Sequence, residues 1–142
     1  MWKYYFPFSK ITGIDIDNRC KKYEQKRIAI YIGDQKNNEF LNKVEKNRGP
    51  FDIIIDDGGH YHSQSIISFE LLFKQLNSGG IYAIEDLHTS YHCDENYDKF
   101  FDYNLTSIEY FKNLIDDINY GKNHFKIDYV HFHPSMIFIG KI

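Results

Sequence analysis

The sequence of 142 residues predicts an α/β fold with a mostly parallel sheet that ends in an antiparallel hairpin. Three observations support this fold class. Phe51 to Asp56 is a segment of strand length whose apolar run Ile53-Ile54-Ile55 ends in carboxylates, as at the ends of buried parallel strands. Strand-like and helix-like segments alternate along most of the chain, which is typical of parallel sheets. Near the C-terminus, two strand-like segments are separated only by His133-Pro134-Ser135, which predicts a hairpin.

The first half of the chain begins with a short aromatic segment. Trp2, Tyr5 and Phe6 are spaced as on a helix that ends before Pro7. The segments that follow are, in order, a strand over 10–17, a short charged helix over 19–26, a strand over 27–34 and a helix over 38–47 that Gly49-Pro50 ends.

The second half contains two predicted helices. Ser63 is a candidate cap for the first, whose apolar face is Ile66, Phe69, Phe73 and Leu76; a left-handed glycine in Ser78-Gly79-Gly80 would end it. A strand over 79–86 follows. Residues 87–104 show no clean period, and we interpret them as a functional loop of the kind that often forms a lid.

Thr106 and Glu109 match a capping box at the start of the second helix. Its predicted buried stripe is Ile108, Phe111, Ile115 and Ile118. The hairpin then pairs 126–132 with 136–139.

Composition limits the function classes. One domain over 1–142 accounts for the length. A net charge of −3 gives no electrostatic footprint for nucleic acid or an anionic membrane, so we expect neither partner. The sequence has no apolar run near the ~18 residues that a membrane span needs. Two cysteines do not make a disulfide framework, so a reducing cytoplasm is the expected location.

Acidic residues end two successive strands and predict a metal site. Asp57 follows the strand over 51–56, and Glu85 and Asp86 end the strand over 79–86. Ligands bind beyond the carboxyl ends of such strands, and hard oxygen ligands suit Mg²⁺. The alternative is that these acids simply face solvent. Two adjacent strands that both end in acids favour the metal site.

His60 is the candidate general base. It follows Asp57 after two glycines that permit a tight turn, and its ordinary pKa lies near working pH. The alternative is a partly exposed loop histidine, and His62 is the competing residue nearby. A zinc cluster of His88, His92 and Cys93 ranks low because no further Cys or His pair completes a tetrahedral site.

Two earlier strands also end in acids. Asp15 lies where nucleotide-binding α/β folds place the carboxylate that bonds ribose, and Asp34 and Gln35 could contact an adenine edge. Acids that merely form turns are an equal alternative for each residue alone. Their order along the chain favours a shared site.

Four segments together resemble a known family. They are Ile11–Asp17, Ile32–Gln35, Ile54–His60 and Gly79–Tyr91, and they resemble class I S-adenosylmethionine-dependent methyltransferases with a Rossmann-like sheet. The branch resembled is that of Mg²⁺-dependent O-methyltransferases that act on sugars of macrolides and related natural products. The resemblance implies metal ligands at Asp57, Glu85 and Asp86 and a general base at His60. It also implies cofactor contacts at Asp15, Asp34, Gln35 and Asp56.

The resemblance also implies a first strand and a glycine-rich turn before Trp2, so we expect an N-terminally incomplete domain with a gap or a collapsed strand pairing beside Ile14. His92 stands where the family usually has tryptophan. The predicted function is O-methylation of a hydroxyl on a sugar or glycosylated natural product, with S-adenosylmethionine and Mg²⁺ as cofactors. The alternatives are a non-catalytic binding module that keeps the fold and a metal-dependent hydrolase that uses the same carboxylates. The sequence leaves the oligomeric state open.

Overall fold

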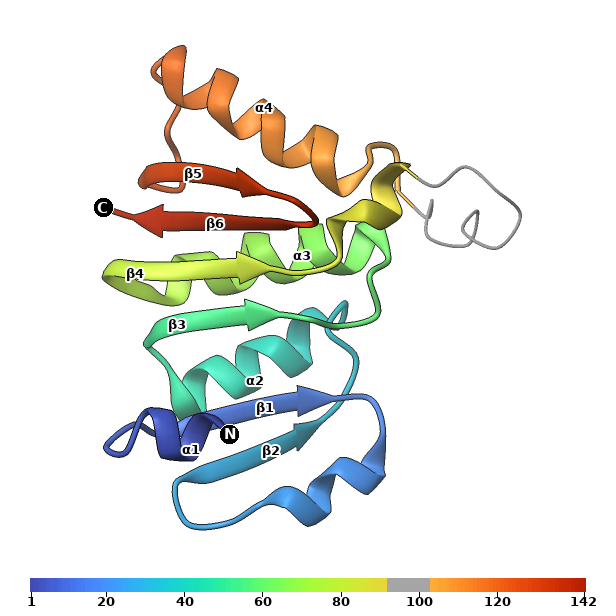
Figure 1. Cartoon of the computed structure of the whole chain (residues 1–142), viewed down its shortest axis with the longest axis vertical. Coiled ribbons are helices and arrows are strands. Elements are labelled where there is room, and N and C mark those ends of the chain that lie inside the picture. The colour runs from blue at the N-terminus through green and yellow to red at the C-terminus, as the bar shows by residue number, and fades with distance from the viewer. Residues whose placement is uncertain (92–102) are drawn as a thin grey trace.

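The computed structural model describes residues 1–91 and 103–142, which form two β-sheets with helices packed against them (Figure 1). Within that part of the chain, no helix is both long enough and apolar enough to cross a bilayer. The sheets contain two and four strands, in the orders β1-β2 and β3-β4-β6-β5. The predicted mostly parallel sheet with a terminal hairpin is confirmed.

The two-stranded sheet pairs β1 (Ile11–Asp15) with β2 (Ile28–Ile32) in parallel, from Ile11 opposite Ile28 to Asp15 opposite Ile32. A short helix α1 (Trp2–Tyr5) precedes it, and the 3₁₀ helix η1 (Asn18–Tyr23) connects its strands. Every residue of β1 and β2 is half-buried.

Helix α2 (Asn38–Arg48) connects the two sheets. Asn37 caps it, since its side-chain oxygen accepts a hydrogen bond from the N–H of Phe40 (3.0 Å). Leu41 and Val44 are its buried residues. Arg48, the last residue of α2, donates hydrogen bonds to the hydroxyl of Thr12 (2.9 Å) and the carbonyl of Ile11 (3.2 Å), so it ties α2 to β1.

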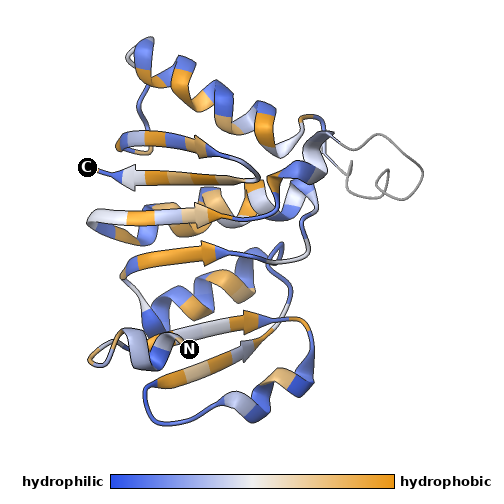
Figure 2. Ribbon diagram, in the orientation of Figure 1, coloured by the Kyte–Doolittle hydropathy of each residue, from blue (hydrophilic) through white to orange (hydrophobic). Residues whose placement is uncertain are grey.

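The four-stranded sheet has β3 (Phe51–Asp56) and β4 (Leu76–Ile84) in parallel and the hairpin β5 (Ile127–His133) and β6 (Met136–Lys141) antiparallel. Asp56 pairs with Ile84, so β3 and β4 end level with each other. Figure 2 shows that β3 is largely hydrophobic and that the turn after it is hydrophilic.

The expected gap in the sheet is confirmed. Among the described residues, no strand is hydrogen-bonded between β1 and β3, and the two sheets remain separate beside Ile14 (Figure 1). Ile53 and Ile55 of β3 are 48% and 39% exposed, although the sequence reads as a strand buried on both faces. Backbone N–H and C=O groups on the facing edges of β1 and β3 therefore lack ladder partners in the part of the chain that the structure describes.

Helix α3 corrects the sequence-based prediction at both ends. It runs over His62–Leu72 with Tyr61 rather than Ser63 at the N-cap, and the 3₁₀ helix η2 (Phe73–Gln75) follows it. Ser78-Gly79-Gly80 lies inside β4, not at the end of a helix, and Gly79 has a φ of 76° where the β3–β4 register shifts. The helix was predicted too long because Leu76, the first residue of β4, is buried in the same core as the apolar face of α3. The helical spacing of apolar residues therefore continues past the end of the helix.

Helix α4 (Ser107–Asn119) has the predicted capping box, because Thr106 accepts a hydrogen bond from the N–H of Glu109 and the Glu109 carboxylate accepts one from Thr106. Its buried stripe differs from the prediction. Leu114 is buried, whereas Ile115 is 36% exposed at the edge of the stripe.

The main core lies between the four-stranded sheet and helices α3 and α4. Phe69 of α3 is wholly buried at its centre. The rings in contact with Phe69 come from η2, β4, α4 and the segment before β5, and they belong to Phe73, Tyr82, Tyr110, Phe111 and Phe125.

Candidate active site

The turn after β3 carries two of the predicted site residues. Asp57 follows the last residue of β3, and Gly58 and Gly59 separate it from His60. His60 has a φ of 60°, which places its backbone in the left-handed region that non-glycine residues seldom adopt. In this conformation the Nε2 atom of His60 lies 4.0 Å from the Oδ1 atom of Asp57.

The neighbouring strand supplies Asp86. It follows β4 at the level where β3 ends, and it also has a left-handed backbone, with a φ of 54°. Its Oδ2 atom lies 3.5 Å from His60 Nε2, and its Oδ1 atom lies 3.7 Å from Nδ1 of His88. Strained backbone at two facing residues is typical of functional sites, because the surrounding structure must hold it in place.

Asp57, His60 and Asp86 form a compact group of potential metal ligands. One ligand atom from each lies within 4.8 Å of the others. The side chains of Asp57 and Asp86 are 60% and 49% exposed, so water and substrate oxygens could complete a coordination shell. Two carboxylates with open positions suit Mg²⁺ or Mn²⁺, which prefer oxygen ligands and retain several waters.

Glu85, the third predicted ligand, is not one of this group among the described residues. Its backbone N–H donates to the carbonyl of Asp56 (2.9 Å), so Glu85 extends the pairing of β3 with β4 by one residue. It is half-buried directly beside Asp86.

Asp56 lies at the centre of a hydrogen-bond network behind the turn. Its carboxylate accepts hydrogen bonds from Gln35 (3.0 Å), Ser68 (2.5 Å) and Tyr82 (3.4 Å). Burial raises the pKa of Asp56, although the bonds from Ser68 and Gln35 oppose this shift. Burial and the neighbouring Asp56 carboxylate also raise the pKa of Tyr82, so its hydroxyl remains a donor.

Gln35 extends from the loop after β2 to the turn after β3. Its amide nitrogen donates to Asp56 and to the Ser68 hydroxyl (3.4 Å), and its oxygen accepts from the N–H of Gly59 (3.4 Å). The structure thus places Gln35, predicted to lie near adenine, against the residues that hold the turn.

Strands β1 and β2 end on the same side of the molecule as β3 (Figure 1); Asp15 is the last residue of β1, and Asp34 lies two residues after β2. Asp15 accepts hydrogen bonds from the N–H of Asp17 (2.8 Å) and the thiol of Cys20 (3.0 Å), which hold the pKa of Asp15 below its ordinary value. Asp34 accepts one from the N–H of Lys36 (2.8 Å).

His62 occupies a different environment from His60. Its side chain is wholly buried, and its Nδ1 atom accepts a hydrogen bond from the N–H of Ser107 (3.2 Å) and lies 3.0 Å from the Ser107 hydroxyl. His62 thus connects the start of α3 to the start of α4.

Three residues near the site were missed in the sequence: Ser68, Tyr82 and His88 as a neighbour of Asp86. Tyr82 gave a usable signal, since a hydroxyl inside an apolar strand needs a partner. The predicted lid and the zinc alternative fall largely on 92–102, which includes His92 and Cys93 and lies outside the described residues.

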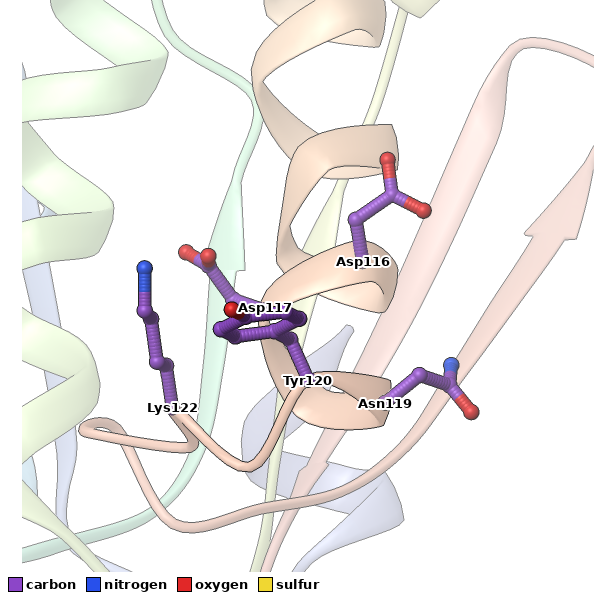
Figure 3. A pocket seen from close by; sticks show the side chains of 5 residues that line it. All are labelled: Asp116, Asp117, Asn119, Tyr120 and Lys122. Atoms are coloured by element: carbon purple, nitrogen blue, oxygen red, sulfur yellow. The ribbon is translucent and has the colours of Figure 1, made fainter.

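A hollow of about 430 Å³ lies at the C-terminal end of α4 (Figure 3). Ser107, which contacts His62, lies at the opposite end of this helix. The hollow is therefore separate from the candidate site; its lining residues are Asp116, Asp117, Asn119, Tyr120 and Lys122.

Comparison with known proteins finds related methyltransferases. The chain is 32% identical over 154 aligned positions to the 8-demethyl-8-alpha-L-rhamnosyl tetracenomycin-C 2'-O-methyltransferase of Streptomyces olivaceus, covering 99% of this chain and 40% of that protein. It is 43% identical over 91 residues to the mycinamicin VI 2''-O-methyltransferase of Micromonospora griseorubida, covering 64% of this chain and 23% of that protein. No family model matches the chain.

A solved structure has the same fold. The MycE methyltransferase from the mycinamycin biosynthetic pathway, in complex with Mg, SAH and mycinamycin VI, superposes with a TM-score of 0.86 at 33% identity. The match covers 99% of this chain and 38% of that one. The chain therefore spans no more than about 40% of the length of these relatives.

Proposed function

Because this chain is homologous to sugar O-methyltransferases and has the fold of S-adenosylmethionine-dependent methyltransferases, we propose that it carries the metal-binding and catalytic part of such a site. The acceptor would be a hydroxyl of a sugar or glycosylated natural product. The observation that carries the proposal is the convergence of Asp57, His60 and Asp86 at the level ends of β3 and β4.

Asp57 and Asp86 would hold a divalent ion, with Glu85 beside them as the third predicted ligand. Their donor atoms fit this role, because carboxylates that lie this close repel one another unless a cation neutralises them. Bound Mg²⁺ would supply Lewis acidity, which orients vicinal sugar oxygens and lowers the pKa of the reacting hydroxyl.

His60 would take the proton of that hydroxyl at Nε2. Asp86, 3.5 Å from this nitrogen, would stabilise the imidazolium that forms. The acceptor oxygen then bonds to the methyl carbon as the carbon–sulfur bond breaks, which leaves the demethylated cofactor. S-adenosylmethionine supplies a methyl group that is already activated, so the protein contributes mainly position and proton transfer.

Asp15 and Asp34 would bind the ribose and adenine side of the cofactor. Both carboxylates lie at strand ends on the same edge as the metal residues, where open α/β sheets bind their ligands.

The net charge of −3 supports a small-molecule acceptor rather than nucleic acid, and two cysteines support a cytoplasmic location.

The test is methyl transfer. The chain, alone and extended by the coding sequence upstream of Met1, is incubated with S-adenosylmethionine, Mg²⁺ and a panel of rhamnosylated acceptors, and products are followed by mass spectrometry. Mg²⁺-dependent gain of one methyl group on a sugar supports the proposal. Metal-dependent cleavage of the acceptor without methylation would favour a hydrolase, and no reaction in either form would favour a binding module.

A further inference from the structure

Gln35 and Asp56 hold the turn that carries Asp57 and His60 from behind. The carboxylate of Asp56 accepts hydrogen bonds from Gln35 and Ser68. The Gln35 oxygen accepts from the N–H of Gly59. The Gln35 side chain therefore links the Asp56 carboxylate to a backbone N–H between Asp57 and His60.

Close packing adds to these hydrogen bonds. A Cβ atom on Gly58 would overlap the side-chain amide of Gln35. The φ of Gly58 is not in the left-handed region, so what this position needs from glycine is space for Gln35 rather than an unusual backbone conformation. The turn and the Gln35 side chain are thus fitted to each other.

The capacity of the Gln35 amide is largely used in this arrangement. Its two N–H groups donate to Asp56 and Ser68, and its oxygen accepts from Gly59. The Asp56 carboxylate in turn accepts hydrogen bonds from Ser68 of α3 and Tyr82 of β4. The network joins the loop after β2, the start of the turn, α3 and β4. Asp57 follows β3 directly, and Asp86 follows β4 after one residue.

We infer that Gln35 and Asp56 are positioning residues, which fix the turn so that Asp57 and His60 face Asp86. This role differs from the cofactor contact that the sequence predicts for both residues. We call the contacts of Gln35 and Asp56 with the turn the clamp. The expected effect of the clamp on metal binding rests on the proposed function, whereas the clamp itself does not. Partners that orient metal ligands typically change metal affinity by about 10–100-fold when they are mutated.

The first experiment tests the clamp without metal. In Gln35→Met, which keeps the side-chain length and removes the amide, we expect the backbone amides of 58–60 to exchange with water about tenfold faster by NMR, the effect of about 1.4 kcal/mol. The matched control is Gln25→Met, since Gln25 is exposed and bonds only Lys3 through its side chain among the contacts seen (2.6 Å). Amides of the β5–β6 hairpin should stay unchanged in both variants, which separates local loosening from general destabilisation.

The second experiment measures Mn²⁺ affinity by calorimetry in the same proteins. Gln35→Met should weaken binding about tenfold and Gln25→Met should not. Gly58→Ala should weaken it by a similar factor, but much less in a Gln35→Ala background, because the overlap with Gln35 is then absent.

Unchanged amide exchange in Gln35→Met would overturn the clamp, and faster exchange with unchanged Mn²⁺ affinity would overturn the positioning role. If the wild-type chain does not bind Mn²⁺ but Gln35→Met still loosens the turn, the proposed metal site fails while the clamp stands. The two failures are therefore distinguishable.

Discussion

The two sheets of this molecule differ in how they are anchored. Ile137 and Ile139 of β6 and Tyr82 of β4 are wholly buried, whereas every residue of β1 and β2 is half-buried. The candidate metal residues follow strands of the well-packed sheet, whereas the candidate cofactor carboxylates lie at the strand ends of the other sheet: Asp15 ends β1, and Asp34 lies just after β2.

This difference teaches that the two parts of the proposed site depend on different interactions. Asp57 and Asp86 are fixed by a parallel strand pair and a shared core. Asp15 and Asp34 depend on one strand pair joined to the rest through α2, the hydrogen bonds of Arg48 and the hydrogen bonds of Gln35. The metal part should therefore be the more robust one.

The largest effect is expected on catalysis. In the form of the protein that shows methyl transfer, His60→Ala should lower the rate by about 10²–10⁴, the usual contribution of a general base. Mn²⁺ affinity should change little, because the two carboxylates remain. If His60→Ala lost as much Mn²⁺ affinity as an Asp57 variant, His60 would be a metal ligand instead. If His62→Ala lowered the rate more than His60→Ala, His60 would not be the general base.

A pair of isoleucine variants compares the two sheets in stability. Ile139→Ala removes a wholly buried side chain and should lower the free energy of unfolding by about 2–5 kcal/mol. Ile30→Ala in half-buried β2 should cost roughly half as much or less, because less apolar surface is lost. Urea unfolding of both variants checks this, and equal costs would contradict the difference in anchoring.

Metal binding can be tested within one strand and its turn. Asp57→Asn should weaken Mn²⁺ binding by roughly 100-fold, because the loss of a ligand should cost at least as much affinity as the largest effects seen for residues that only orient ligands. Asp52→Asn is the control, since Asp52 lies near the start of β3 and bonds Asn77 (2.8 Å). Similar affinities in the two variants would place the ion elsewhere.

The capping box of α4 gives the smallest effect. Thr106→Ala should lower stability by about 1 kcal/mol, as for other N-caps. Hydrogen bonds from Thr106 hold the pKa of Glu109 in the folded protein below its ordinary value of 4.5. The ionised Glu109 carboxylate therefore stabilises the fold fully above that value, and this stabilisation is lost as the pH falls through the pKa of Glu109 in the folded protein. The difference in stability between wild type and Glu109→Gln should therefore narrow in acid; a difference that is constant from pH 7 to pH 3 would contradict this assignment.

Features that depend on local sequence patterns could be predicted, whereas features that depend on long-range contacts could not. The capping box at Thr106 and the apolar run before Asp57 are local patterns, and the structure contains both elements. The end of α3 was misplaced because Leu76 is buried whether it lies on a helix or a strand. The bonds of Gln35 to Asp56 and Gly59 join segments about two dozen residues apart, so no local pattern shows them.

The most direct test of the account is one calorimetric titration of the 142-residue chain with S-adenosylhomocysteine in the presence of saturating Mn²⁺. Because no strand of residues 1–91 and 103–142 pairs with the facing edges of β1 and β3, the carboxylates of Asp15 and Asp34 alone should hold the cofactor weakly. The account predicts a stoichiometric Mn²⁺ isotherm beforehand and little or no heat from the cofactor. Tight, stoichiometric cofactor binding would contradict it, because the two parts of the site would then be equally well formed in this chain.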